Sequence, residues 1–154
     1  IIPDVIRALS VGEKVFLRNP NHTRPWQHVL DPLYGYLVLA KKNYVNNQEI
    51  SHAFNFGPYL SSNKKVSDLV DYIFTIWEGK SVLQKKNDNL HESGLLYLNI
   101  EKAILELNWR PNWDFKTAVE KTISWYKRNH QKECAYSLCM ENINDFTNDL
   151  RLKL

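Results

Sequence analysis

The sequence predicts an α/β fold in which helices alternate with short strands. Two features support this class: apolar residues recur at helical spacing in several segments, and short apolar runs lie between those segments. The chain has 154 residues, of which 44% are hydrophobic, and this is sufficient for one core. Because no internal repeat or low-complexity linker interrupts the pattern, we expect a single domain over residues 1–154.

The first third of the chain predicts a helix, a strand and a second helix. An apolar helical face stops at Gly12, and the run from Val15 to Leu17 is typical of a short strand. A long amphipathic helix is expected to begin just after His28, with Pro32 tolerated in its first turn. The apolar faces consist of Ile2, Val5, Ile6 and Leu9 in the first helix and Leu30, Leu33, Tyr34, Leu37 and Tyr44 in the second.

The remaining two thirds predict two strands and four helices. The strands are expected at 53–56 and at about 95–98. A helix with Val66, Leu69, Val70, Ile73 and Trp77 on one face should end at Gly79. Asn99 and Asp114 are suitable caps for the next two helices, and a final helix is expected from about 133 to 148. Most of the five tryptophans and eight tyrosines are expected to pack in the core rather than bind a ligand.

Composition argues against several functional classes. The net charge is only +3 and the basic residues are dispersed, so we expect no nucleic-acid partner. Cys134 and Cys139 lack His or Cys neighbours at zinc spacing and predict two free thiols on one helix of an intracellular protein. No apolar run approaches the roughly 20 residues that cross a bilayer, and no signal peptide precedes Ile1, so we expect a cytoplasmic chain without a membrane partner. The missing initiator Met predicts a fragment or a processed chain.

Residues 18–32 concentrate two arginines, two histidines and a tryptophan in a stretch with the character of a loop. The guanidinium groups of Arg18 and Arg24 are permanently charged, and each can donate a pair of hydrogen bonds to a phosphate. The indole of Trp26 can cover the flat face of a base or sugar. This stretch therefore indicates a phosphorylated, aromatic ligand, and an exposed basic loop with a packed tryptophan is the alternative interpretation.

Several short motifs follow one another between residue 1 and about residue 130. They are Ile2-Pro3-Asp4, Arg18-Asn19-Pro20, Arg24-Pro25-Trp26-Gln27-His28, Asn55-Phe56-Gly57-Pro58, His91-Glu92, Leu107-Asn108-Trp109-Arg110-Pro111 and Trp125-Tyr126. In this order they resemble the CDP-glucose 4,6-dehydratases of the extended short-chain dehydrogenase/reductase family. The resemblance implies an enzyme of two parts, in which a leading Rossmann half carries the cofactor and a trailing half grips the nucleotide sugar. It covers the C-terminal, substrate-binding part alone, with the Rossmann half missing.

The resemblance implies roles for four polar residues. Arg24 lies at the position where family members hold the diphosphate of the sugar nucleotide, and Arg18 follows the strand that flanks the nucleotide. His91 is expected to donate to a phosphate or the ribose, and Glu92 to accept from ribose hydroxyl groups. An ordinary surface position is the alternative for each of them.

Three further residues are candidates for the substrate site. Ile2 and Pro3 resemble the segment that packs on the base or ribose, with a core role at the start of a helix as the alternative. Trp26 completes the predicted substrate-binding set as a cover for the base or sugar. His28 is expected to be a buried, hydrogen-bonded support for the loop rather than a catalytic base.

The groups that carry the family's chemistry are not found in the sequence. The five glycines are too dispersed for a Gly-x-Gly-x-x-Gly phosphate loop. None of the eight tyrosines has a lysine four positions later, the pair in which the ammonium lowers the pKa of the phenol. We therefore expect no catalytic residue and no cofactor bound by this chain, with NAD in the intact family enzyme.

The predicted function is the substrate-binding half of a CDP-glucose 4,6-dehydratase-like enzyme, inactive alone. By resemblance, the intact enzyme converts CDP-glucose to CDP-4-keto-6-deoxyglucose with NAD. The expected partners are this nucleotide sugar, a Rossmann-half polypeptide and a second copy in a homodimer, and apolar surface should be exposed where the Rossmann half is missing. Two alternatives stay open: a stand-alone nucleotide-sugar-binding module and a degenerate remnant of a split gene.

Overall fold

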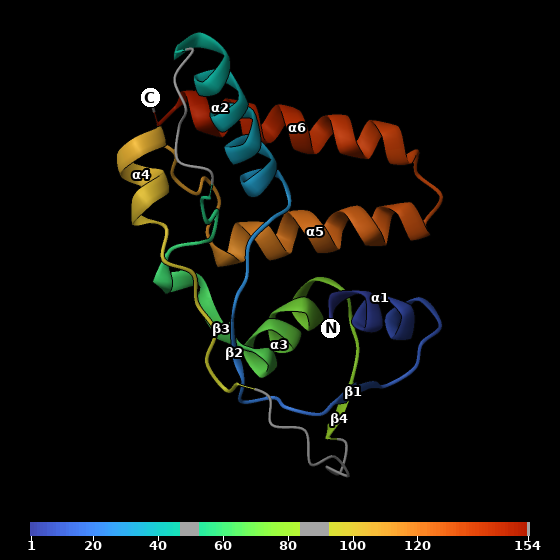
Figure 1. Cartoon of the computed structure of the whole chain (residues 1–154). Helices are drawn as coiled ribbons and strands as arrows, with labels where there is room; N and C mark the ends of the chain where they lie inside the picture. The colour runs from blue at the N-terminus through green and yellow to red at the C-terminus, as the bar shows by residue number, and fades with distance from the viewer. Residues whose placement is uncertain (47–52, 84–92, 154) are drawn as a thin grey trace.

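The computed structural model describes residues 1–46, 53–83 and 93–153 (Figure 1). Helices dominate these residues, and each strand has only three residues. The elements in chain order are α1 (Ile2–Ser10), β1 (Val15–Leu17), β2 (Thr23–Pro25), α2 (Leu30–Asn46), a 3-10 turn (Leu60–Ser62), β3 (Asn63–Lys65), α3 (Val66–Ile76), β4 (Ser81–Leu83), α4 (Glu101–Leu107), α5 (Phe115–His130) and α6 (Ala135–Arg151).

Helix α5 packs against both α3 and α6. Helix α6 returns antiparallel to α5 on one side, whereas α3 lies against α5 on the other side with α1 next to it (Figure 1). Helix α2 packs against α4 at the opposite end of the molecule from α1. Within the described ranges, no helix has both the length and the apolar character needed to cross a membrane.

The four strands in the described part of the chain form two separate pairs. β1 and β4 are parallel, with Val15 opposite Ser81 and Leu17 opposite Leu83. β2 and β3 are antiparallel, with Arg24 opposite Lys64. A long crossover between β1 and β4 contains α2 and α3, which is the kind of connection that parallel strands need.

Two apolar clusters hold the fold together. The larger one joins α1, β1, α3 and α5 through Val5, Leu9, Val15, Leu17, Leu69, Val70, Ile73, Phe115, Val119 and Ile123. The smaller one, beneath α2 and α4, consists of Phe56, Ile100, Ala103, Leu107 and Trp109. Gly35 in α2 lies directly against the smaller cluster, because a Cβ atom at position 35 would overlap the ring of Phe56.

All six predicted helices are confirmed, with small shifts at their ends. α5 begins where expected, because the Asp114 Oδ1 atom accepts the backbone N–H of Thr117 at 2.9 Å. The Asn99 side chain accepts the backbone N–H of Glu101 at 2.9 Å, so it caps α4 from one residue further out than the N-cap position. The final helix begins two residues later than predicted and continues to Arg151.

Both predicted strands in the second part of the chain are wrong. Residues 53–56 adopt no regular structure, and side chains bind their carbonyl groups: Lys102 donates to Ala53 and Gln27 to Phe56, both at 2.9 Å. Residues 95–98 contribute only a single bridge, between Leu95 and Thr23. An apolar run forms a strand only when another strand pairs with its backbone, and these segments lack such a ladder among the described residues.

Three strands were not predicted from sequence. β2 lies inside the stretch that was expected to be a loop, so Arg24 is on a strand rather than a loop. β3 is Asn-Lys-Lys and carries no apolar alternation, and all three residues of β4 are exposed. Their pairing partners define these strands, and their own residue patterns give no signal.

Candidate functional site

Arg24 lies in the middle of β2, where three segments of the chain meet. One side of β2 pairs with β3, and on the other side Thr23 bridges Leu95. The Nη1 atom of Arg24 donates to the carbonyl oxygens of Thr23 at 2.9 Å and Ser93 at 3.1 Å. Its Nη2 atom lies 3.4 Å from Nδ1 of His22. Backbone carbonyl groups from two segments therefore fix the orientation of this guanidinium.

The other predicted polar residues can be placed only in part. Arg18 directly follows β1, which pairs with β4 rather than with the strand of Arg24, and its side chain is exposed. His91 and Glu92 lie outside the described residues. Ser93, which accepts a hydrogen bond from Arg24, is the residue that follows Glu92 in the sequence.

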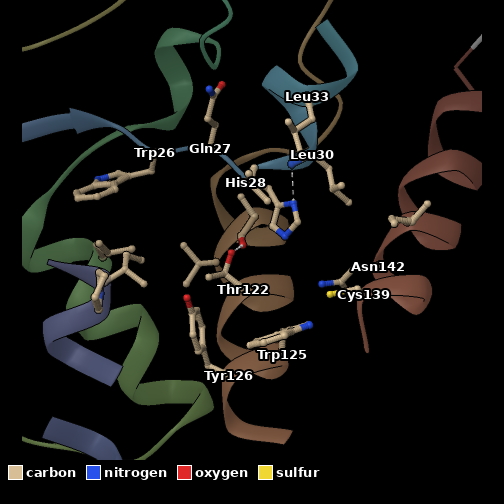
Figure 2. A pocket seen from close by; sticks show the side chains of 17 residues that line it. Trp26, Gln27, His28, Leu30, Leu33, Thr122, Trp125, Tyr126, Cys139 and Asn142 are labelled. Atoms are coloured by element: carbon tan, nitrogen blue, oxygen red, sulfur yellow. Dashed lines mark hydrogen bonds between the residues drawn. The ribbon is translucent and has the colours of Figure 1, made fainter. Parts of the chain in front are cut away.

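A cavity of about 600 Å³ opens between the start of α1, the segment that joins β2 to α2, and helices α5 and α6 (Figure 2). We refer to it as the apolar groove. Among the described residues, no Asp, Glu, Lys or Arg lines it. Its walls consist of Ile2, Pro3, residues 26–30, Leu33, Leu69, Ala118, Val119, Thr122, Trp125, Tyr126, Cys139, Asn142 and Ile143.

Three predicted substrate-binding residues come together in the apolar groove. Ile2, Pro3 and Trp26 all line it, and the Trp26 indole is fixed by a 2.9 Å hydrogen bond from Nε1 to the carbonyl of Lys64 on β3. Neither Arg24 nor Arg18 is part of the lining. The predicted set therefore divides into a polar region around Arg24 and an apolar region around Trp26.

His28 is buried at the edge of the apolar groove, as the sequence predicted. Its Nδ1 atom accepts the backbone N–H of Leu30 at 3.2 Å (Figure 2), and its ring packs edge-on against Trp113 with centroids 4.8 Å apart. Burial, assisted by the positive charge of Lys121, lowers the pKa of His28 to about 4. The imidazole is therefore neutral near pH 7, and its role is to support the start of α2.

Asp31, the second residue of α2, is fully buried. Its Oδ1 atom accepts the backbone N–H of Asn112 at 2.6 Å, and no hydrogen-bond partner was found for Oδ2 within the described part of the chain. Burial raises the pKa of Asp31 to about 6, although the N–H groups of Asn112 and Trp113 and the charge of Lys153 act in the opposite direction. Asp31 is thus a buried structural carboxyl group with an unusual pKa.

The C-terminal segment completes the surroundings of Asp31. Lys153 donates to Oδ1 of Asn112 at 2.8 Å, and Trp113 donates from Nε1 to Asp149 at 2.7 Å. Asp31 falls in the first turn of the helix that the sequence predicts to begin just after His28, but the sequence did not reveal this cluster. An acidic residue in the first turn of a helix is common on exposed surfaces, so the sequence carried no signal of its burial.

Other kinds of site receive no support from the described residues. No group of three His, Cys, Asp or Glu side chains is arranged to hold a metal ion in residues 1–46, 53–83 and 93–153. Cys134, at the N-cap of α6, and Cys139, within α6, are free exposed thiols, as predicted. Hydrogen bonds from the first turn of α6 lower the pKa of the Cys134 thiol.

Comparison with a curated protein gives a clear relationship. The chain is 37% identical over 128 residues to CDP-glucose 4,6-dehydratase of Salmonella typhimurium, a match that covers 82% of this chain and 36% of the relative. The chain thus spans little more than a third of that protein. No family model matches the sequence.

Solved structures show the same fold. The dTDP-glucose 4,6-dehydratase of Bacillus anthracis in complex with NAD aligns with a TM-score of 0.65 and 20% identity over 84% of this chain and 40% of its own. The UDP-glucuronic acid 4-epimerase of Bacillus cereus in complex with UDP-glucuronic acid and NAD aligns with a TM-score of 0.66 and 15% identity. This alignment covers 81% of this chain and 38% of the epimerase. The chain has the fold of the C-terminal part of these dehydratases and epimerases, and its sequence is related to that of CDP-glucose 4,6-dehydratase.

Proposed function

We propose that this chain is the substrate-binding part of a CDP-glucose 4,6-dehydratase-like enzyme and that Arg24 binds the diphosphate of the nucleotide sugar. The observation that carries the proposal is the oriented guanidinium of Arg24 in a chain 37% identical to a CDP-glucose 4,6-dehydratase. A guanidinium already fixed by backbone carbonyl groups loses little side-chain entropy when it binds a phosphate. Binding energy from the diphosphate then serves to orient the hexose.

The other predicted residues have supporting roles in this proposal. Arg18 is exposed at the end of β1, where it is accessible to a second phosphate oxygen. His91 and Glu92 contact the ribose or a phosphate, which is favoured by the hydrogen bond between Arg24 and the adjoining Ser93. Ile2, Pro3 and Trp26 pack against the base or ribose from the side of the apolar groove.

The residues of this chain do not fit a nicotinamide dinucleotide. A dinucleotide site needs a glycine-rich turn that leads from a strand into a helix. Gly12, the glycine nearest to a strand in the first third of the chain, leads instead from α1 to β1. We propose that a companion polypeptide, equivalent to the leading part of the longer relatives, supplies the cofactor site and the catalytic groups. The chain should then be inactive by itself.

Reconstitution tests this function. The chain is joined in one polypeptide to the leading part of the Salmonella typhimurium dehydratase, and dehydration of CDP-glucose is followed. The Arg24→Ala variant should raise KM by roughly 10- to 100-fold, since a hydrogen bond between charged groups contributes about 1.5–3 kcal/mol. Arg151→Ala, which removes an exposed arginine at the end of α6, is the matched control and should leave KM unchanged. A folded fusion with no activity would contradict the proposal.

A further inference from the structure

Lys64 is the residue of β3 that lies directly opposite Arg24. Strands β2 and β3 run side by side, and their register pairs Arg24 with Lys64 (Figure 1). Directly opposite residues project from the same face of a sheet, with Cβ atoms about 4.5–5.5 Å apart. Lys64 therefore brings a second positive charge to the face of the sheet from which Arg24 projects.

The Lys64 side chain is accessible to a ligand. It is exposed, and its ammonium group makes no hydrogen bond or ion pair with any residue that the structure describes. Other lysines of the chain are engaged: Lys121 pairs with Asp145, and Lys127 donates to the carbonyl oxygen of Ile76. The three N–H donors of Lys64 are therefore left for a ligand or for water.

The pairing of two cations costs the folded chain stability. Like charges directly opposite each other on neighbouring strands are destabilising, and lysine is a poor strand former. The sequence of β3 is Asn63-Lys64-Lys65, so no apolar side chain of this strand offsets the cost. An anion bound between the side chains of Arg24 and Lys64 would replace this repulsion by two attractive interactions.

The backbone of Lys64 connects this position to the region assigned to the base or ribose. The Nε1 atom of Trp26 donates to the carbonyl oxygen of Lys64 at 2.9 Å, and Trp26 lines the apolar groove. Lys64 is thus hydrogen-bonded to Trp26 and paired with Arg24 by strand register. In a nucleotide sugar the diphosphate is attached to the ribose, so a cation that adjoins both residues is suitably placed for the diphosphate.

We infer that Lys64 is a second diphosphate-binding residue, whose ammonium group neutralises phosphate charge that Arg24 alone leaves uncompensated. This inference rests on the proposed function, because it assigns another residue to the same diphosphate. Both phosphate groups of a diphosphate are negatively charged, and Arg24 supplies a single positive charge. The ammonium group of a lysine binds phosphate as a point charge on a flexible stem, so it can adapt to a diphosphate that the fixed guanidinium has oriented.

The experiment titrates CDP by calorimetry into the fusion with the leading part of the Salmonella typhimurium dehydratase. Lys64→Ala removes the ammonium group, and Lys64→Arg keeps a positive charge that can bind phosphate. Lys65→Ala is the matched control, because neighbouring residues of a strand project from opposite faces. The backbone N–H of Lys65, which donates to Asp68 at 3.2 Å, is retained in this control. Urea unfolding of the ligand-free chain with each substitution measures the structural effect.

We expect Lys64→Ala to weaken CDP binding by roughly 3- to 10-fold, because an exposed ammonium group contributes less than an oriented guanidinium. Lys64→Arg and Lys65→Ala should bind CDP as the unchanged fusion does. In the ligand-free chain, Lys64→Ala should leave the urea midpoint unchanged or raise it, because the repulsion between Lys64 and Arg24 is removed. A purely structural role of Lys64 would instead lower the midpoint and the affinity together.

Unchanged CDP affinity of Lys64→Ala would overturn the inference, as would an equal loss of affinity in Lys65→Ala or a lowered urea midpoint for Lys64→Ala. The Arg24→Ala variant in the same titration separates this inference from the proposed function. If Arg24→Ala weakens CDP binding and Lys64→Ala does not, the inference fails and the proposed function stands. If the unchanged fusion folds but does not bind CDP, both fail.

Discussion

The carboxyl group of Asp31 accepts the backbone N–H of Asn112 at 2.6 Å, although the two residues are 81 positions apart in the sequence. This bond joins the start of α2 to the turn that precedes α5, and Lys153 contacts the same turn from the end of the chain through Oδ1 of Asn112. His28 contacts the same turn, because its ring packs against Trp113. Two buried titratable groups with opposite pKa shifts therefore share one small region of the fold.

The Asp31 carboxyl group should make its contribution to stability under acidic conditions. Its pKa is raised from 3.8 to about 6 in the folded chain, so between these values the folded state binds more protons than the unfolded state. Its contribution is fully present below about pH 4 and is lost as the pH rises through about 6. In urea unfolding, the stability of the unchanged chain relative to Asp31→Asn should increase by up to about 3 kcal/mol as the pH falls from 6 to 4. A difference that does not vary with pH would contradict this assignment.

His28 should have the opposite effect in nearly the same pH range. Its pKa is lowered from 6.5 to about 4, so the unfolded chain takes up a proton that the folded chain resists. The contribution of the neutral ring is present above pH 6.5 and is lost as the pH falls toward 4. Relative to His28→Asn, whose side-chain oxygen can still accept the N–H of Leu30, the unchanged chain should lose up to about 3 kcal/mol over this interval. Parallel pH profiles of the two proteins would show that His28 titrates normally.

The glycine at position 35 should not tolerate a side chain, even though it lies within a helix. Gly35→Ala adds helix propensity of about 1 kcal/mol, but the new methyl group would overlap the ring of Phe56. Overpacking of this kind costs about 1–3 kcal/mol, so we expect a net loss of stability in thermal or urea unfolding. Asn43→Ala, on an exposed position of the same helix, should be neutral or slightly stabilising. An increase in stability for Gly35→Ala would show that Phe56 can move away.

The N-cap of α5 should contribute measurably to stability. Asp114→Ala removes the acceptor for the backbone N–H of Thr117 and should cost about 1 kcal/mol in urea unfolding. Asp114→Asn keeps a suitable acceptor oxygen and should retain most of the stability. The same hydrogen bond lowers the pKa of Asp114, so its contribution should be lost at strongly acidic pH, where the carboxylate is protonated. Equal stability of both variants and the unchanged chain would argue against the cap.

The sequence was most informative where local physics decides the structure. The apolar spacing located every helix, and the capping residues Asn99 and Asp114 located the starts of α4 and α5. The strands were predicted poorly because their backbone partners determine them: β3 is entirely polar, whereas the apolar segment 53–56 forms no strand. Strand pairing depends on residues distant in the sequence, and a single sequence does not reveal it.

The candidate site was predictable in its parts but not in its arrangement. Arg24 and Trp26 were identified by residue chemistry and by resemblance, and His28 was correctly expected to be a buried support. The division between the polar region of Arg24 and the apolar groove of Trp26 was not foreseen, because the stretch was expected to be a loop, whereas Arg24 lies on β2 and Trp26 follows the end of that strand. The burial of Asp31 depends on Asn112, far along the chain, and had no local signal.

Calorimetric titration of CDP into the fusion of this chain with the leading part of the Salmonella typhimurium dehydratase tests the role of Arg24 most directly. CDP carries the diphosphate without the hexose, so the measurement isolates the contact assigned to this guanidinium. We expect Arg24→Ala to weaken CDP binding by roughly 10- to 100-fold and Arg151→Ala to leave it unchanged. Equal affinity of the Arg24→Ala variant and the unchanged fusion would show that Arg24 does not bind the diphosphate.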